Sequence, residues 1–232
     1  MSDTHTIKQF EEELRLIKEK VLMLGGLVEE GIANSIKALV ERDTQLAERT
    51  IENDHVVNGL EVEIDELCLK VLALRQPAAS DLRLITTAVK IITDLERIGD
   101  MAVNVCERVL ELNEEAPLKP YIDIPRMAEA AQRMLKESLD AFVNGDTDLA
   151  TKVLVEDDFV DDLNRQIFRE LLTFMMEDPN TISRAMKILF ISKYIERIAD
   201  HATNIAEMVV FMVKGKVIRH IKQQQEQERG KD

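Results

Sequence analysis

Two stretches of the chain repeat the same polar residues at the same spacing. Residues 95–107 read LERIGDMAVNVCE and residues 195–207 read IERIADHATNIAE. The identical pairs are Glu96/Glu196, Arg97/Arg197, Ile98/Ile198, Asp100/Asp200, Ala102/Ala202, Asn104/Asn204 and Glu107/Glu207. Because apolar rather than polar residues fill protein cores, packing alone seldom requires such a set. The repetition therefore indicates a chemical role.

In an α-helix, the acidic residues of each stretch form one stripe. At 100° per residue, Glu96, Asp100 and Glu107 fall within about 40° of one another, with Asn104 beside them. The apolar residues centre about 160° away, so the stripe faces outward or toward a groove. Carboxylates four residues apart repel each other by a few tenths of a kcal/mol unless a cation neutralises them. The stripe predicts a cation site, and the alternative is an ordinary solvated helix face.

A second pair of stretches supplies further oxygen donors. Residues 43–64 (DTQLAERTIENDHVVNGLEVEI) align without a gap with residues 146–167 (DTDLATKVLVEDDFVDDLNRQI), and Asp54 pairs with Asp157. Adjacent antiparallel helices could bring these acids to the stripes. Carboxylates without convergent Cys or His favour hard or borderline cations such as Mg²⁺, Mn²⁺, Fe³⁺ or Ca²⁺.

The sequence thus predicts two metal centres. The ligands of the first are Asp54, Glu96 and Asp100, and those of the second are Asp157, Asp161, Glu196 and Asp200. The first copy has Asn58 where the second has Asp161. The second centre, with one more carboxylate, is expected to hold metal more tightly.

Histidines do not fit a ferritin-like oxidase. Those bundles use Glu-x-x-His twice, but Glu52-x-x-His55 has Val155 in place of the glutamate in the second copy. His201 adjoins Asp200 but points about 100° away from it along the helix, and the first copy has a methionine there. His201 is interpreted as incidental.

Other catalytic patterns are missing from the sequence. It contains no Gly-rich phosphate loop, nucleophile elbow or Ser/His/Asp constellation. We therefore expect no catalytic residue, no organic cofactor and no enzyme activity. The repeated pair Arg97/Arg197 either neutralises neighbouring acids or binds an anion.

The elements that position these residues are six long helices. Apolar residues recur three and four positions apart, and turn residues divide the chain. The expected helices cover about 5–42, 44–75, 80–112, 124–144, 146–177 and 180–214. Short connections favour antiparallel neighbours, so we predict an all-α fold of two tandem antiparallel three-helix bundles. The expected domains are residues 1–115 and 116–214, followed by a polar tail, 215–232.

Three glycines carry specific expectations. Gly25 and Gly26, inside the first helix, are expected to allow close helix packing. Gly145 is expected to cap the end of the fourth helix. The Met-rich stretch EMVVFMV (207–213) is expected to offer apolar surface to partner helices.

Composition narrows the class of protein. The chain has 232 residues, 45% of them hydrophobic and only 4% aromatic, which is typical of a helical globular protein. A net charge of −14 opposes nucleic-acid binding. The start lacks a secretory signal pattern, and no apolar run approaches the ~18 residues of a membrane span, so we expect a cytoplasmic protein. Cys68 and Cys106 are expected to be buried thiols.

The repeated motifs resemble the PhoU family of bacterial phosphate-transport accessory proteins. The resemblance rests on DLERIGDMAVNV (94–105), YIERIADHATNIAE (194–207) and LRQPAASDLRLI (74–85), and covers residues 5–214. It implies six helices in two bundles and a homodimer. It also implies metal clusters, of iron or else Zn, Mn, Mg or Ca, on a Glu/Asp-x-x-x-Asp motif that maps onto Glu96 with Asp100 and Glu196 with Asp200.

The function implied by the resemblance is that of a cytoplasmic regulatory adaptor. It would negatively regulate phosphate uptake and phosphate-regulon signalling by contacting the ATPase subunit of the phosphate ABC transporter and a sensor histidine kinase. The protein would then be peripheral to the membrane only through its partners. A metal-dependent phosphohydrolase is the alternative. The sequence favours the adaptor, because no general-base histidine lies beside the acid stripe.

Overall fold

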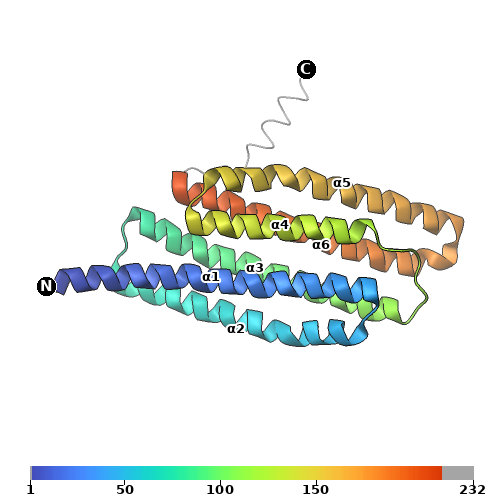
Figure 1. Cartoon of the computed structure of the whole chain (residues 1–232), viewed down its shortest axis with the longest axis horizontal. Coiled ribbons are helices and arrows are strands. Elements are labelled where there is room, and N and C mark those ends of the chain that lie inside the picture. The colour runs from blue at the N-terminus through green and yellow to red at the C-terminus, as the bar shows by residue number, and fades with distance from the viewer. Residues whose placement is uncertain (1, 216–232) are drawn as a thin grey trace, which may run out of the picture.

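The computed structural model describes residues 2–215, with side chains from residue 8 onward. The first bundle contains α1 (Ser2–Glu41), α2 (Thr44–Arg75) and α3 (Ala79–Asn113). The second contains α4 (Asp123–Asn144), α5 (Thr147–Glu177) and α6 (Ile182–Lys214), with a 3₁₀ turn, η1 (Pro179–Thr181), before α6. Apart from Gly215, the expected polar tail lies outside the described residues. The predicted all-α fold of two three-helix bundles is confirmed (Figure 1).

The two bundles lie side by side with their long axes roughly aligned (Figure 1). Contacts between them run along two pairs of helices, α3 with α6 and α1 with α4. Within the described residues, α2 and α5 contact only elements of their own bundle, so each lies on an outer side of the molecule. Each predicted metal centre is therefore on the outer flank, where α2 meets α3 or α5 meets α6.

Helix ends repeat between the two copies because the residues that stop them repeat. Asp43 caps α2 by accepting a hydrogen bond from Leu46 N (2.9 Å). Asp146 caps α5 by accepting from Asp148 N and Leu149 N, each at 3.0 Å. Gly145 ends α4 in the left-handed conformation (φ 66°), as expected of this glycine.

The core faces agree between the copies, which fixes the direction of the acid stripes. Ile98, Ala102 and Val105 are buried on α3, and their counterparts Ile198, Ala202 and Ile205 are buried on α6. The stripes consequently point away from the core, as the periodicity predicts. In contrast, the stretch 207–213 is mostly internal, with Val209, Val210 and Met212 buried. It does not supply the apolar surface that we expected of it.

Gly25 and Gly26 have different surroundings. A Cβ added at Gly25 would lie 2.2 Å from Leu139 Cδ1 of α4, so this glycine allows α1 and α4 to approach closely. Nothing lies within 4 Å of a Cβ added at Gly26. The packing prediction holds for Gly25, at the boundary between the bundles, and is wrong for Gly26.

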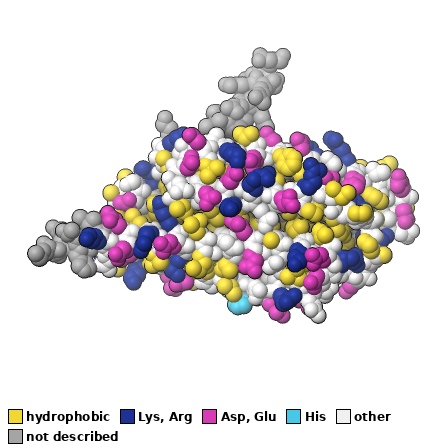
Figure 2. All heavy atoms as spheres, viewed as in Figure 1, with side chains coloured by type: hydrophobic (Ala, Val, Ile, Leu, Met, Phe, Trp, Pro, Cys, Tyr) yellow, Lys and Arg dark blue, Asp and Glu magenta, His cyan; other side chains and the backbone are white. Residues whose placement is uncertain are grey.

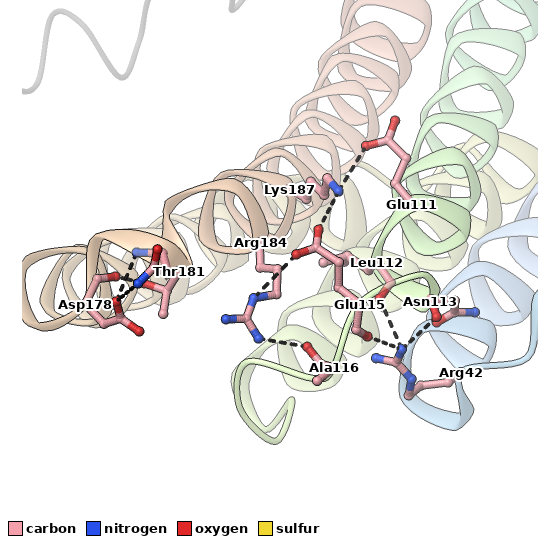
Figure 3. Close-up of polar contacts among 11 residues, drawn as sticks. Arg42, Glu111, Leu112, Asn113, Glu115, Ala116, Asp178, Thr181, Arg184 and Lys187 are labelled. Atoms are coloured by element: carbon pink, nitrogen blue, oxygen red, sulfur yellow. Dashed lines mark hydrogen bonds and ion pairs between the residues drawn. The ribbon is translucent and has the colours of Figure 1, made fainter.

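The linker between the copies is held from both sides (Figure 3). Arg42 Nη2, at the α1–α2 turn, donates to the carbonyl oxygens of Leu112 and Asn113 (3.1 Å each) and of Glu115 (2.6 Å). From the second bundle, Lys187 Nζ lies 3.0 Å from Glu115 Oε1. The arginine satisfies two carbonyls of the last turn of α3 and one just beyond it, and together with Lys187 it holds the start of the linker against both bundles.

The visible face of the molecule has mixed charge. Hydrophobic side chains form a band along its long axis, with acidic and basic side chains on both sides of the band (Figure 2). This face thus presents no continuous basic field of the kind that binds nucleic acid. Across residues 2–215, the helices lack an apolar stretch long enough to cross a bilayer.

Candidate metal centres

The first predicted centre lies where α2 and α3 run side by side. Asp54 is on α2, whereas Glu96 and Asp100 are on successive turns of α3. Asp54 leans over α3 at Gly99, where an added Cβ would lie only 3.3 Å from Asp54 Oδ1. The glycine therefore lets the α2 carboxylate approach the α3 turn that carries the other two acids.

The carboxylates of the first centre repel one another. Burial, followed by the charges of Asp100, Glu61 and Asp54, raises the pKa of Glu96 above its usual value, and Arg97 partly opposes this rise. Burial and the charge of Asp54 also raise the pKa of Asp100. A cation placed among these groups would relieve the repulsion. The effect on Glu96 supports the acid-neutralising role for Arg97.

Asp54 is oriented by its own helix and borders open space. Asn58 Nδ2, one turn later, donates to Asp54 Oδ2 at 2.8 Å. A hollow of about 280 Å³ between α1, α2 and α3 is lined in part by Asp54, Gly31, Asn34 and Asn53. The carboxylate therefore has room for a ligand beside it.

The second predicted centre has the same plan on α5 and α6. Burial, followed by the charges of Glu196, Asp157 and Asp161, raises the pKa of Asp200 to about 6, and Lys193 opposes this rise. The other three predicted carboxylates of this centre thus act on Asp200, one from α6 and two from α5. We refer to these four carboxylates as the second acidic cluster.

A lysine distinguishes the second centre from the first. Lys193 Nζ lies 2.6 Å from Glu196 Oε1, and the equivalent position of the first copy is Thr93. The ammonium group already neutralises part of the second cluster. A metal ion must compete with this lysine for Glu196.

The donor atoms fit a hard cation, but they are not assembled around a point. Within the described residues, no three Asp, Glu, His or Cys side chains converge into a preformed ligand set. All the predicted ligands are carboxylates, which suit Mg²⁺, Ca²⁺, Mn²⁺ and iron. For a metal ion to bind at either cluster, the Asp and Glu side chains of that cluster would have to rotate toward the ion.

The structure adds Glu61, which sequence reasoning missed, to the first cluster. Glu61 lies seven residues after Asp54, two helical turns away on the same face, and its counterpart in the second copy is Asn164. Each cluster therefore contains four carboxylates rather than three and four. The basis for expecting tighter binding at the second centre is removed, and Lys193 favours the opposite order.

The remaining polar residues singled out by sequence lie outside the clusters. His201 Nδ1 is 2.8 Å from Asp94 Oδ1, a contact that joins α6 to α3 between the bundles. His55 Nδ1 is 2.6 Å from the carbonyl oxygen of Glu52. Glu107 forms an ion pair with Arg108 (3.6 Å). These contacts give both histidines structural partners away from the predicted metal ligands.

Comparison with known proteins gives matches over nearly the whole chain. The model of the PhoU domain matches residues 21–109 and 124–209, once in each copy. The phosphate-specific transport system accessory protein PhoU homolog of Pseudomonas aeruginosa is 44% identical over 94% of this chain and 90% of its own length. The accessory protein PhoU of Escherichia coli (strain K12) is 41% identical over the same shares of the two chains.

Solved structures agree with these sequence matches. The crystal structure of PhoU from P. aeruginosa superposes with a TM-score of 0.86 at 44% identity, covering 89% of this chain and all of that one. The crystal structure of the phosphate transport system regulatory protein PhoU from Streptococcus pneumoniae superposes with a TM-score of 0.84 at 30% identity. It covers 90% of this chain and 99% of that one.

Proposed function

Because the chain belongs to the PhoU family, we propose that it is a regulatory accessory protein of a phosphate-specific transport system. The observation that carries this proposal is the match of both copies, over 94% of the chain, to relatives named for that role. The protein acts as an adaptor in the cytoplasm and negatively regulates phosphate uptake and phosphate-regulon signalling.

Its partners are the ATPase subunit of the phosphate ABC transporter and the sensor histidine kinase of the phosphate regulon. Both proteins work at the membrane, so an adaptor whose helices within residues 2–215 include no membrane span would reach the membrane through them. The outer positions of α2 and α5 support this role, because they leave each bundle one flank that the other bundle does not cover. The protein itself is a homodimer.

Metal ions bind at the two acidic clusters. Asp54, Glu61, Glu96 and Asp100 would hold one ion or cluster, with iron the first candidate and Zn, Mn, Mg and Ca the alternatives. Asp157, Asp161, Glu196 and Asp200 would hold the other. A bound cation would supply charge neutralisation at the α2–α3 and α5–α6 flanks. The ligand residues come from two helices at each site, α2 and α3 in the first bundle and α5 and α6 in the second. In the first bundle, Asp54 of α2 lies over Gly99 of α3.

Deleting the gene tests the adaptor role. In phosphate-rich medium, loss of a negative regulator should raise expression of phosphate-starvation genes, and the intact gene on a plasmid should restore repression. A reporter fused to a phosphate-starvation promoter measures this. Unchanged expression in the deletion strain would contradict the proposal.

A metal-dependent phosphohydrolase is the second candidate, because two carboxylate clusters could hold the multinuclear centre that such hydrolysis uses. The adaptor is favoured, since the relatives that match both copies are named as accessory proteins of phosphate transport. Release of phosphate from p-nitrophenyl phosphate by Mn²⁺- or Fe²⁺-loaded protein, and its loss in Glu196→Ala, would establish the hydrolase instead.

A further inference from the structure

A groove on the outer flank of the second bundle combines apolar and basic side chains. It lies between α5 and α6 and has a volume of about 530 Å³. Phe168, Leu189 and Phe190 form its apolar lining, and Arg165, Arg169 and Lys193 are its basic residues. Phe168 and Phe190 are 47% and 46% exposed, so these two rings remain largely open to solvent.

Three of the lining positions carry charged residues of a different kind in the first copy. By the repeat, Phe168 and Arg169 correspond to Asp65 and Glu66, and Phe190 corresponds to Lys90. Five of the six buried positions of α2 align with buried positions of α5, so the outward positions of these two helices are equivalent in space as well. Two exposed aromatic rings and an arginine stand in the second copy where the first copy has charged residues, and this difference indicates a surface that is used in the second copy.

The charges of the groove select an acidic occupant. Arg165 and Lys193 are paired with Asp162 and Glu196 of the same chain. Arg169 makes no ion pair within the part of the chain that the structure describes. The guanidinium group of Arg169 is therefore available to a carboxylate from outside, in a chain whose net charge is −14.

The shape and charge of the groove exclude two other occupants. A second copy of this chain, paired groove to groove about a twofold axis, would place these arginines against themselves. A flat bilayer does not fill a hollow between two helices. A single helix can fill this groove, because amphipathic helices bind by laying their apolar face into such grooves.

We propose that the α5–α6 groove is the docking site for one amphipathic helix of a partner protein. Apolar side chains of that helix, three and four residues apart, pack on Phe168 and Phe190, and its flanking Asp or Glu residues pair with Arg169. The inference rests on the adaptor role proposed above and names the surface that performs it.

Photocrosslinking from the groove tests this inference in the full-length protein. The photoreactive amino acid p-benzoylphenylalanine replaces Phe168 or Phe190, because it keeps the phenylalanine ring and adds a benzoyl group that reacts with a ligand lying in the groove. The same amino acid at Asp65 or Lys90 provides the matched control on the first copy. Proteins are expressed at native level in the organism that carries the gene, irradiated, and the crosslinked segments are sequenced by mass spectrometry.

Both groove probes should capture the same acidic, amphipathic helical segment of another protein, and the control positions should not. Arg169→Glu in the Phe190 probe protein should reduce the yield by about fivefold or more, because an interface anchor of this kind dominates binding. Circular dichroism confirms that this exposed substitution leaves the fold intact. Equal capture by the controls, capture of a second copy, of lipid or of a basic segment, or no crosslink at all would overturn the inference.

The starvation-gene reporter is measured in the same strains. Repression by the intact chain without any crosslink from the groove would refute the docking site and leave the regulatory role standing. Loss of the gene without effect on the reporter would refute the regulatory role, whatever the probes capture.

Discussion

Asp200 shows how an acidic cluster without a bound cation lowers the stability of the folded protein. Burial and three neighbouring carboxylates raise the pKa of Asp200 from 3.8 to about 6. A carboxyl group with a raised pKa in the folded state binds its proton more tightly there than in the unfolded chain. Its contribution to stability is therefore greatest at low pH and is lost as the pH rises from about 4 through 6.

Asp200→Asn should mimic the protonated form permanently. In the presence of EDTA, the variant should need more urea to unfold than the parent at pH 7.5, and the difference should vanish below pH 4. Urea titrations across this range measure the effect. Glu48→Gln removes an exposed carboxylate outside both clusters and controls for the general loss of charge. Equal gains for both variants at all pH values would contradict the explanation.

Metal binding should offset the loss of folding stability that repulsion among the carboxylates causes. An ion bound only by the folded protein stabilises it by about 2.7 kcal/mol at a hundredfold excess over the dissociation constant. Replacing Glu96 and Asp100 by Ala should remove the larger share of the metal-dependent rise in melting temperature. Replacing Glu196 and Asp200 should remove the smaller share, because Lys193 competes at that cluster.

Lys193→Met provides the matched test of that order. The substitution keeps a long side chain and removes the competing charge, so metal binding at the second cluster should tighten. Calorimetric titration with Mn²⁺ and metal analysis measure affinity and stoichiometry. If all variants bind as the parent does, the clusters are solvated helix faces.

Seven of the clustered acids could be predicted from the sequence. The two copies within this chain can be aligned with each other, so polar positions retained in both copies stand out without an alignment of related proteins. The sequence could not reveal Glu61, whose counterpart is Asn164, since the repeated pattern skips that position. Nor could it show that Lys193 pairs with Glu196, because side-chain pairing depends on rotamers and not on spacing alone.

At the scale of elements, local signals placed the helices well. The expected range 44–75 coincides with α2, and the expected 146–177 differs from α5 by one residue, because Asp43 and Asp146 are capping residues that act within a single turn. The start of α6 was less predictable. Pro179 lies within a 3₁₀ turn that delays the α-helix to Ile182. The surroundings of each glycine depend on the neighbouring helix, which periodicity does not describe.

Gly25 and Gly26 form a matched pair for testing helix packing. Gly26→Ala should stabilise the protein by about 0.5–1 kcal/mol, because glycine is a poor helix former and the added methyl group meets open space. Gly25→Ala gains the same stabilisation from the better helix-forming tendency of alanine, but its added methyl group must displace the side chain of Leu139. Its free energy of unfolding from urea titration should therefore be lower than that of Gly26→Ala. The reverse order would show that α1 and α4 are not packed as described.

At the scale of the whole molecule, the two bundles share the α3–α6 and α1–α4 boundaries and leave α2 and α5 outside. Exposed apolar residues remain on the outer helix of the first bundle, including Leu69 and Leu74 at 57% and 64% exposure. Self-association could cover such residues.

Sedimentation equilibrium should report about twice the 26.5 kDa mass of the chain. Dilution to nanomolar protein provides the comparison, because a dimer dissociates with dilution and a compact monomer does not change. A mass of one chain at high micromolar concentration would contradict the homodimer.

The reaction rate of the two thiols can report how often the first bundle opens. Cys68 and Cys106 both belong to the first bundle, and their counterparts in the second are Leu171 and Ala206. Burial raises the pKa of each thiol to about 12, so neither supplies reactive thiolate while its bundle stays closed. Modification by a thiol reagent should therefore follow transient opening of the first bundle alone. Comparing that rate with the rate of global unfolding reveals whether the duplicated halves open together or one at a time.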